Sequence, residues 1–211
     1  MDQRSYLHNQ WLSAWAALNL QPPAGLYEQL LCAYAQPQRH YHTLQHLSEC
    51  LSWLDKVLHT AKRPGEVAIA LWFHDAIYDV RGGSNEQQSA NWAMRALQAA
   101  GTTAEVQQRV LALILATQHH AEPAAGDAQL LVDIDLAILG ASPARFAQYT
   151  QQIQQEYAWV PETLFQNRRL AVLQGFVQRP RIYSTPYFHD LLEAQARLNL
   201  SAAIQSLAPT P

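Results

Sequence analysis

The hydrophobic and polar positions of this chain follow the spacing of helices. Apolar residues recur at intervals of three and four positions, whereas a half-buried strand would place them at every second position. Alanine, leucine and glutamine are abundant, and only 8 of the 211 residues are glycine, a composition that favours helix. The pattern predicts an all-α fold with helices over residues 3–20, 23–36, 43–60, 66–79, 86–100, 103–120, 127–140, 143–157, 161–178 and 187–207.

The breaks between these helices are short and coincide with proline and glycine. No break is long enough to serve as a linker between domains, and 211 residues suit one domain with a sizeable core. We therefore expect a single domain over residues 1–211. Within it we place a motif core at 39–140, C-terminal helices at 143–207, and frayed ends at 1–2 and 208–211.

Composition and charge narrow the classes of protein that remain. The net charge of -3 and the pI of about 6.3 do not indicate a positively charged surface that would attract the phosphate backbone of a nucleic acid. No nucleic-acid partner is therefore expected. No apolar run reaches the length of a membrane span and the N-terminus lacks a targeting pattern, which predicts a cytoplasmic protein without membrane attachment. Cys32 and Cys50 do not have the CxxC spacing of a zinc knuckle or of a redox motif, so we expect both to be reduced, buried and structural.

One apolar helix ends in two ionisable residues. Val67 to Phe73 is apolar on every side, which predicts a buried helix, and His74 and Asp75 follow directly. Ionisable groups in such a place are costly unless they are paired, hydrogen-bonded or bound to a metal, and we favour a metal. Asp79 lies four residues beyond Asp75, so both carboxylates would face one cavity if the helix continued to residue 79. A role for Asp79 in a turn at the end of the helix is an equal alternative.

Three further segments carry polar residues on apolar helices. His42 and His46 are four positions apart in RHYHTLQH, a spacing that would stack both rings on one helix face. The other two segments are LATQHH, with His119 and His120, and LLVDIDLAILG, with Asp133 and Asp135. Four apolar helices with such interruptions predict one convergent metal site.

The order of these residues, His46, then His74 and Asp75, then a later aspartate, resembles the HD superfamily of metal-dependent phosphohydrolases. Over residues 39–200 the chain is also similar to a bacterial and plant branch described as predicted HD phosphohydrolases, through RHYHTLQH, FHDAIYD, SNEQQSA, ATQHH, DIDLAILG, EYAWVPETLF, RRLAVL, RPRIY and ARLNL. The resemblance implies an HD-type helical bundle. It also implies hydrolysis of phosphate esters by a metal-activated water.

The resemblance assigns roles to individual residues. It implies His46, His74, Asp75 and Asp135 as metal ligands, and His42 as the acid that protonates the leaving oxygen. Asp79 alone is left to orient the water, because Tyr78 replaces the first acid found after HD in alarmone hydrolases. Asp135 fits the last ligand position better than Asp133, but the choice between the two stays open, and the other carboxylate is expected beyond the direct ligands of the metal. His120 is the residue that decides whether a second metal binds. One divalent metal is expected, with Mn, Co, Mg, Ni, Zn and Fe left open.

The substrate is expected to be a small phosphorylated molecule that resembles a nucleotide, whether a monoester or a diester. Arg39 and Arg168 are candidates to hold phosphate oxygens, and Asn85 either reaches the site or caps its own helix. Two alternatives stay open: a catalytically silent sensor of a nucleotide or metal, and an HD-type diiron oxygenase, for which a separated histidine is missing. A homodimer also stays open.

Overall fold

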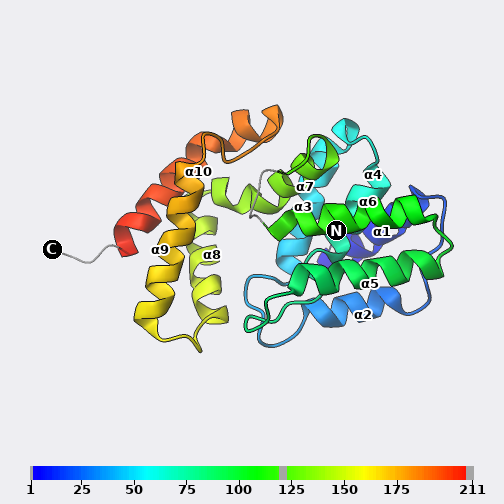
Figure 1. Cartoon of the computed structure of the whole chain (residues 1–211), viewed down its shortest axis with the longest axis horizontal. Coiled ribbons are helices and arrows are strands. Elements are labelled where there is room, and N and C mark those ends of the chain that lie inside the picture. The colour runs from blue at the N-terminus through cyan, green and yellow to red at the C-terminus, as the bar shows by residue number, and fades with distance from the viewer. Residues whose placement is uncertain (1, 119–122, 208–211) are drawn as a thin grey trace. The chain divides into compact units, whose positions relative to one another are not determined.

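The computed structural model describes residues 2–118 and 123–207, and helices dominate this part of the chain (Figure 1). None of the described residues forms a strand, which confirms the all-α prediction. The α-helices are α1 (Gln3–Ala16), α2 (Leu26–Tyr34), α3 (Leu44–Val57), α4 (Pro64–Phe73), α5 (Asn85–Ala99), α6 (Ala104–Leu115), α7 (Asp127–Asp135), α8 (Pro143–Glu156), α9 (Glu162–Gln178) and α10 (Pro186–Leu207). The short 3-10 helices are η1 (Leu58–Thr60), η2 (Ala116–Gln118) and η3 (Leu136–Gly140).

Each predicted helical range coincides with one α-helix, but one boundary error affects the site. The range 66–79 was expected to be helical throughout, and α4 instead begins at Pro64 and ends at Phe73. Proline suits the first turn of a helix, because its missing N–H has no partner there. His74 and Asp75 therefore lie in the turn that follows α4.

The chain divides into two compact units, residues 1–132 and 133–211. Helix α7 belongs to both, since its last three residues fall in the second unit. The expectation of a single domain over 1–211 stays a prediction. Among the described helices, none combines the length and the apolar character needed to span a membrane.

Helix α4 forms the centre of the N-terminal unit. It packs against α1, α3, α5 and α6, and every residue from Gly65 to Phe73 is buried. Trp72 contacts Trp11 edge to face, with ring centroids 5.1 Å apart. The buried carboxylate of Glu66 accepts two hydrogen bonds from Arg109 on α6, at 2.6 and 2.8 Å. These contacts fix the position of α4 and of the turn at its end.

The C-terminal unit is organised around α10, which packs against η3 and α9, while α8 packs against η3. The side-chain amide of Asn199 on α10 donates to the carbonyl oxygens of Leu139 and Ala141, both at 2.8 Å. Gly140 allows this close approach, because a Cβ atom placed there would lie 2.6 Å from Leu192 Cβ and 2.9 Å from the Leu192 carbonyl oxygen.

Gly140→Ala is therefore expected to destabilise the protein by about 1–3 kcal/mol through overpacking, measured as the free energy of unfolding in urea. Gly175→Ala is the matched control in the same unit. Gly175 lies inside α9, and no atom approaches within 4 Å of a Cβ placed there, so alanine should stabilise the helix by roughly 0.5–1 kcal/mol. Equal effects of the two substitutions would contradict the close packing of α10 on η3.

Candidate metal centre

The turn after α4 presents two ionisable side chains at the end of a buried helix. His74 is 1% exposed, and its Nδ1 lies 2.8 Å from the carbonyl oxygen of Leu71, one turn back in α4. A carbonyl oxygen only accepts, so this contact places a proton on Nδ1. Such a hydrogen bond is the usual way in which a protein fixes the ring of a metal-binding histidine.

Helix α3 supplies the second imidazole. Thr43 is its N-cap residue and its side chain accepts a hydrogen bond from the backbone N–H of Gln45, so the helix begins at Leu44. His46 falls in the first turn on the buried face of α3 and is 2% exposed. The ring of Tyr41 lies against it, with centroids 4.7 Å apart.

Three potential ligand atoms of these segments converge. The Nε2 atoms of His46 and His74 lie 3.2 Å apart. Asp75 Oδ2 lies 3.0 Å from His74 Nε2 and 3.4 Å from His46 Nε2. Ligands bound to one cation at about 2.0–2.1 Å are spaced by about 3.3 Å in a tetrahedron and about 2.9 Å in an octahedron. The three atoms therefore have the spacing of ligands that share one metal ion.

The electrostatic surroundings keep Asp75 ionised. Burial raises the pKa of this carboxyl group, but the neighbouring His74 and His42 and the hydrogen bonds with His46 and His74 outweigh burial and hold the pKa well below its usual range. An ionised carboxylate beside two imidazoles is a donor set typical of zinc and other divalent transition metals.

Cys50 also belongs to this cluster. It lies one turn beyond His46 on α3 and is 2% exposed, and its Sγ atom is 3.7 Å from His46 Nε2. Its ligand atom lies within 4.8 Å of those of His46 and His74, so these residues form a group that could hold a metal ion. No prediction from the sequence named Cys50 as a possible ligand, although its i, i+4 spacing to His46 is visible there. The expectation of two buried cysteines is correct for Cys50 and wrong for Cys32, which is exposed.

Arg39 connects the two segments that carry the ligands. Its guanidinium group donates to the carbonyl oxygens of Asp75 at 2.6 Å, Ala76 at 3.0 Å and His42 at 3.2 Å. The side chain is 5% exposed. The expectation that Arg39 grips phosphate oxygens is therefore corrected, because its donors point to protein carbonyls. Arg39 acts on the site by holding the turn at Asp75 against the segment that precedes α3.

His42 lies near the cluster but does not share a helix with His46. It precedes the N-cap of α3, so the expected i, i+4 stacking on one helix face is wrong. The two rings are 5.9 Å apart between centroids, and His42 stacks on Tyr78 at 4.0 Å. The helix predicted over residues 43–60 begins after His42, so that prediction already placed His42 outside the helix that carries His46.

Asp79 and Asn85 stabilise the loop that leaves the site. Because α4 ends at Phe73, Asp79 does not lie one helical turn beyond Asp75, and it is exposed. Its carboxylate accepts a hydrogen bond from the backbone N–H of Arg81 at 2.9 Å. The side chain of Asn85, the first residue of α5, makes hydrogen bonds to both the N–H and the carbonyl oxygen of Asp79 at 3.0 Å. These contacts hold the loop and are not a helix cap, and the expectation that Asn85 reaches the site stays a prediction.

The two aspartates of α7 differ in their surroundings. Asp133 is fully buried, and its carboxylate accepts hydrogen bonds from the N–H groups of Ser184 and Thr185 and from the Thr185 hydroxyl, at 2.6–2.9 Å. Burial raises the pKa of Asp133, although the hydrogen bonds from Thr185 and Ser184 oppose this effect. Asp133 thus anchors the segment that opens α10. Asp135 ends α7 and is half-buried, and its assignment as the last metal ligand stays a prediction.

The remaining candidates are not tested by the geometry. Arg168 is exposed on α9, and its role in phosphate binding stays a prediction. His119 and His120 lie outside the described residues, so the question of a second metal is not addressed by the structure.

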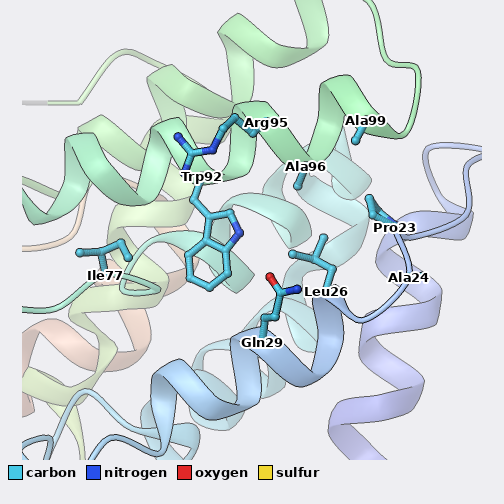
Figure 2. A pocket seen from close by; sticks show the side chains of 9 residues that line it. All are labelled: Pro23, Ala24, Leu26, Gln29, Ile77, Trp92, Arg95, Ala96 and Ala99. Atoms are coloured by element: carbon cyan, nitrogen blue, oxygen red, sulfur yellow. The ribbon is translucent and has the colours of Figure 1, made fainter.

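A separate cavity of about 410 Å³ lies between α2 and α5. Figure 2 shows the indole ring of Trp92, from α5, between the two helices with the side chain of Gln29 beside it. Ile77 also lines this cavity, and its backbone N–H donates to Ser89 Oγ at 3.0 Å. None of the residues that line the cavity is a candidate metal ligand, so it is distinct from the metal centre.

Comparison with protein-family models, with curated proteins and with solved structures finds no match to this chain. Membership of the HD superfamily therefore stays a prediction from the sequence motifs.

Arg39→Gln is expected to weaken metal binding by about 10–100-fold, as is usual when a residue that positions the ligands is lost. The physical reason is that glutamine cannot hold the carbonyl groups of Asp75 and Ala76 together with that of His42. The measurement is a competition titration of zinc against a chromophoric chelator, with circular dichroism to verify folding. Arg168→Gln, which changes an exposed arginine, is the control and should leave the affinity unchanged. Unchanged affinity in folded Arg39→Gln would contradict this positioning role.

Proposed function

We propose that this protein is a metal-dependent hydrolase of phosphate esters, with a small nucleotide-like molecule as substrate. The observation that carries the proposal is the convergence of His46 Nε2, His74 Nε2 and Asp75 Oδ2 within 3.4 Å of one another. Both histidines and the carboxylate occupy the positions that the HD resemblance assigns to metal ligands. The prediction that Asp135 completes the set is part of the proposal.

The surroundings of the cluster favour a catalytic site over a structural one. Structural zinc sites are closed by protein ligands on all sides, whereas catalytic sites keep a position open to water or substrate. His46 and His74 are buried, but the Asp75 side chain is 18% exposed. Solvent access at Asp75 would let a substrate reach the cation.

The residues around the ligand cluster would have separate roles in hydrolysis. When bound, a divalent cation supplies Lewis acidity toward a phosphate ester and acidity to a coordinated water. His74 is oriented by its hydrogen bond to Leu71, and the turn that carries Asp75 is held by Arg39. His42, stacked on Tyr78 outside the ligand cluster, is the group proposed to give a proton to the leaving oxygen.

The proposal is tested by measuring bound metal and hydrolysis together. Purified protein is reconstituted with Mn, Co, Mg, Ni, Zn or Fe and screened against nucleotides and other phosphate esters, with products followed by chromatography. Asp75→Asn should lose tight metal binding and hydrolysis, because it removes the only ionised oxygen donor among the three converging groups. Asp190→Asn is the control, since Asp190 is 80% exposed on α10, and it should retain both.

Three results would count against the hydrolase. Full hydrolysis by Asp75→Asn would remove Asp75 from the site. Nucleotide binding without turnover of any ester would favour a sensor. Two irons per chain with consumption of oxygen would favour an oxygenase.

His42→Asn tests the proposed proton donor through the nature of the leaving group. General acid catalysis contributes about 10²–10⁴-fold, so turnover of an alkyl phosphate should fall by at least about 100-fold. Turnover of p-nitrophenyl phosphate should fall far less, because nitrophenolate leaves without a proton. Metal content should be unchanged, and His59→Asn, at an exposed residue of η1, should behave as wild type. Equal losses for both esters would remove His42 from this role.

A further inference from the structure

Tyr78 lies against the proposed proton donor, and the proposed function leaves it without a task. Its ring stacks on the imidazole of His42, with centroids 4.0 Å apart and an interplanar angle of 26°. His42 precedes α3 and Tyr78 lies in the loop between α4 and α5, so neither residue belongs to a helix. Both side chains are half-buried. The orientation of the imidazole therefore depends on side-chain contacts rather than on a helix that carries it.

Arg39 holds both members of this stack. Its guanidinium group donates to the carbonyl oxygen of His42 at 3.2 Å, and its Cζ atom lies over the Tyr78 ring, 5.5 Å from the centroid. A guanidinium within about 6 Å of the face of an aromatic ring is attracted to it. The ring of Tyr41 also contacts His42, at 80° and with centroids 4.9 Å apart. Two aromatic rings thus hold the imidazole, and the arginine that positions the turn at Asp75 also positions its stacking partner.

The proton donor of the proposed reaction needs a fixed orientation. The oxygen of water bonds to phosphorus while the bond between phosphorus and the leaving oxygen breaks, and the proton of His42 passes to that oxygen. The attacking water gives its proton to solvent, from which the imidazole is protonated again. A general acid must lie within about 2.6–3.2 Å of the atom that it protonates, and misplacement by about 1 Å costs up to about 100-fold in rate. An imidazole on irregular backbone rotates away from this position unless a neighbour restrains it.

We propose that Tyr78 is a positioning residue that acts through His42, and that the face of its ring restrains the imidazole in the orientation that serves the leaving oxygen. This inference rests on the proposed function, because it concerns the proton donor of the same site. The contact is made by the ring, so it does not need the hydroxyl group. Phenylalanine should therefore replace Tyr78, whereas a residue without an aromatic ring should release His42.

Tyr78→Ala and Tyr78→Phe are compared on an alkyl phosphate and on p-nitrophenyl phosphate. In Tyr78→Ala, kcat for the alkyl ester should fall by at least about 10-fold, but by no more than in His42→Asn, because the misplaced imidazole no longer serves the leaving oxygen. The kcat for p-nitrophenyl phosphate should fall far less, and bound metal should be unchanged. Tyr78→Phe should keep the wild-type ratio of the two rates. Tyr187→Ala, at an exposed tyrosine of α10, is the control and should behave as wild type.

The double variant Tyr78→Ala, His42→Asn separates this role from a structural one. If Tyr78 acts through His42, its removal should cost nothing further on the alkyl ester once His42 is replaced. A further loss as large as in Tyr78→Ala alone overturns the proposal. Equal losses on both esters in Tyr78→Ala, or full activity of that variant, overturn it as well. These results leave the proposed hydrolase standing, whereas a wild-type protein that turns over no ester removes the hydrolase and this inference together.

Proton NMR of the histidine rings measures the stack without a substrate. An aromatic ring shifts the resonances of a group stacked on its face upfield, and the spectrum of His42→Asn identifies the resonances of His42. The upfield shift should persist in Tyr78→Phe and be lost in Tyr78→Leu, which fills the space without a ring. An unchanged shift in folded Tyr78→Leu would overturn the restraint by Tyr78. Should Tyr78→Ala not fold, the rates of Tyr78→Leu on the two esters take its place.

Discussion

A helix that is buried on every side can carry ionisable groups only where they find partners, as Glu66 of helix α4 finds Arg109, and α4 meets the same need at its end. From Gly65 to Phe73 it is enclosed by α1, α3, α5 and α6, and His74 and Asp75 follow in the turn. Desolvation of this pair would be costly, and the structure compensates by bringing both side chains to the imidazole of His46. The candidate metal centre thus follows from how α4 is packed.

The turn is held by a buried arginine whose partners are backbone carbonyls. Hydrogen bonds to a charged group contribute about 1.5–3 kcal/mol each, and Arg39 donates to three carbonyl oxygens from two separate segments. One side chain therefore joins the segment before α3 to the turn after α4. The spacing of the ligand atoms depends on this link, because His46 and Asp75 belong to different segments. A lysine could not reproduce this fork of donors.

The sequence predicted most of the fold and the two central histidines, because these depend on local patterns. Hydrophobic periodicity and proline and glycine breaks predicted each α-helix, and polar residues at the end of an apolar run predicted His74 and Asp75. The roles of Arg39 and Asp133 depended instead on contacts between segments distant in the chain. Asp79 was misplaced because propensity alone did not show where α4 ends. Cys50 was missed although it lies one turn from His46, because His74 becomes its neighbour only after folding.

The central claim is that His46, His74 and Asp75 bind one divalent metal ion. X-ray absorption at the edge of the metal bound to the purified protein measures this most directly, because imidazole rings give a characteristic outer-shell scattering. Two imidazoles at about 2.0–2.1 Å with at least one oxygen are expected, and both imidazoles should be lost in a His46→Ala, His74→Ala double variant. A spectrum without imidazole scattering, or one that the double variant leaves unchanged, would show that these histidines do not bind the metal.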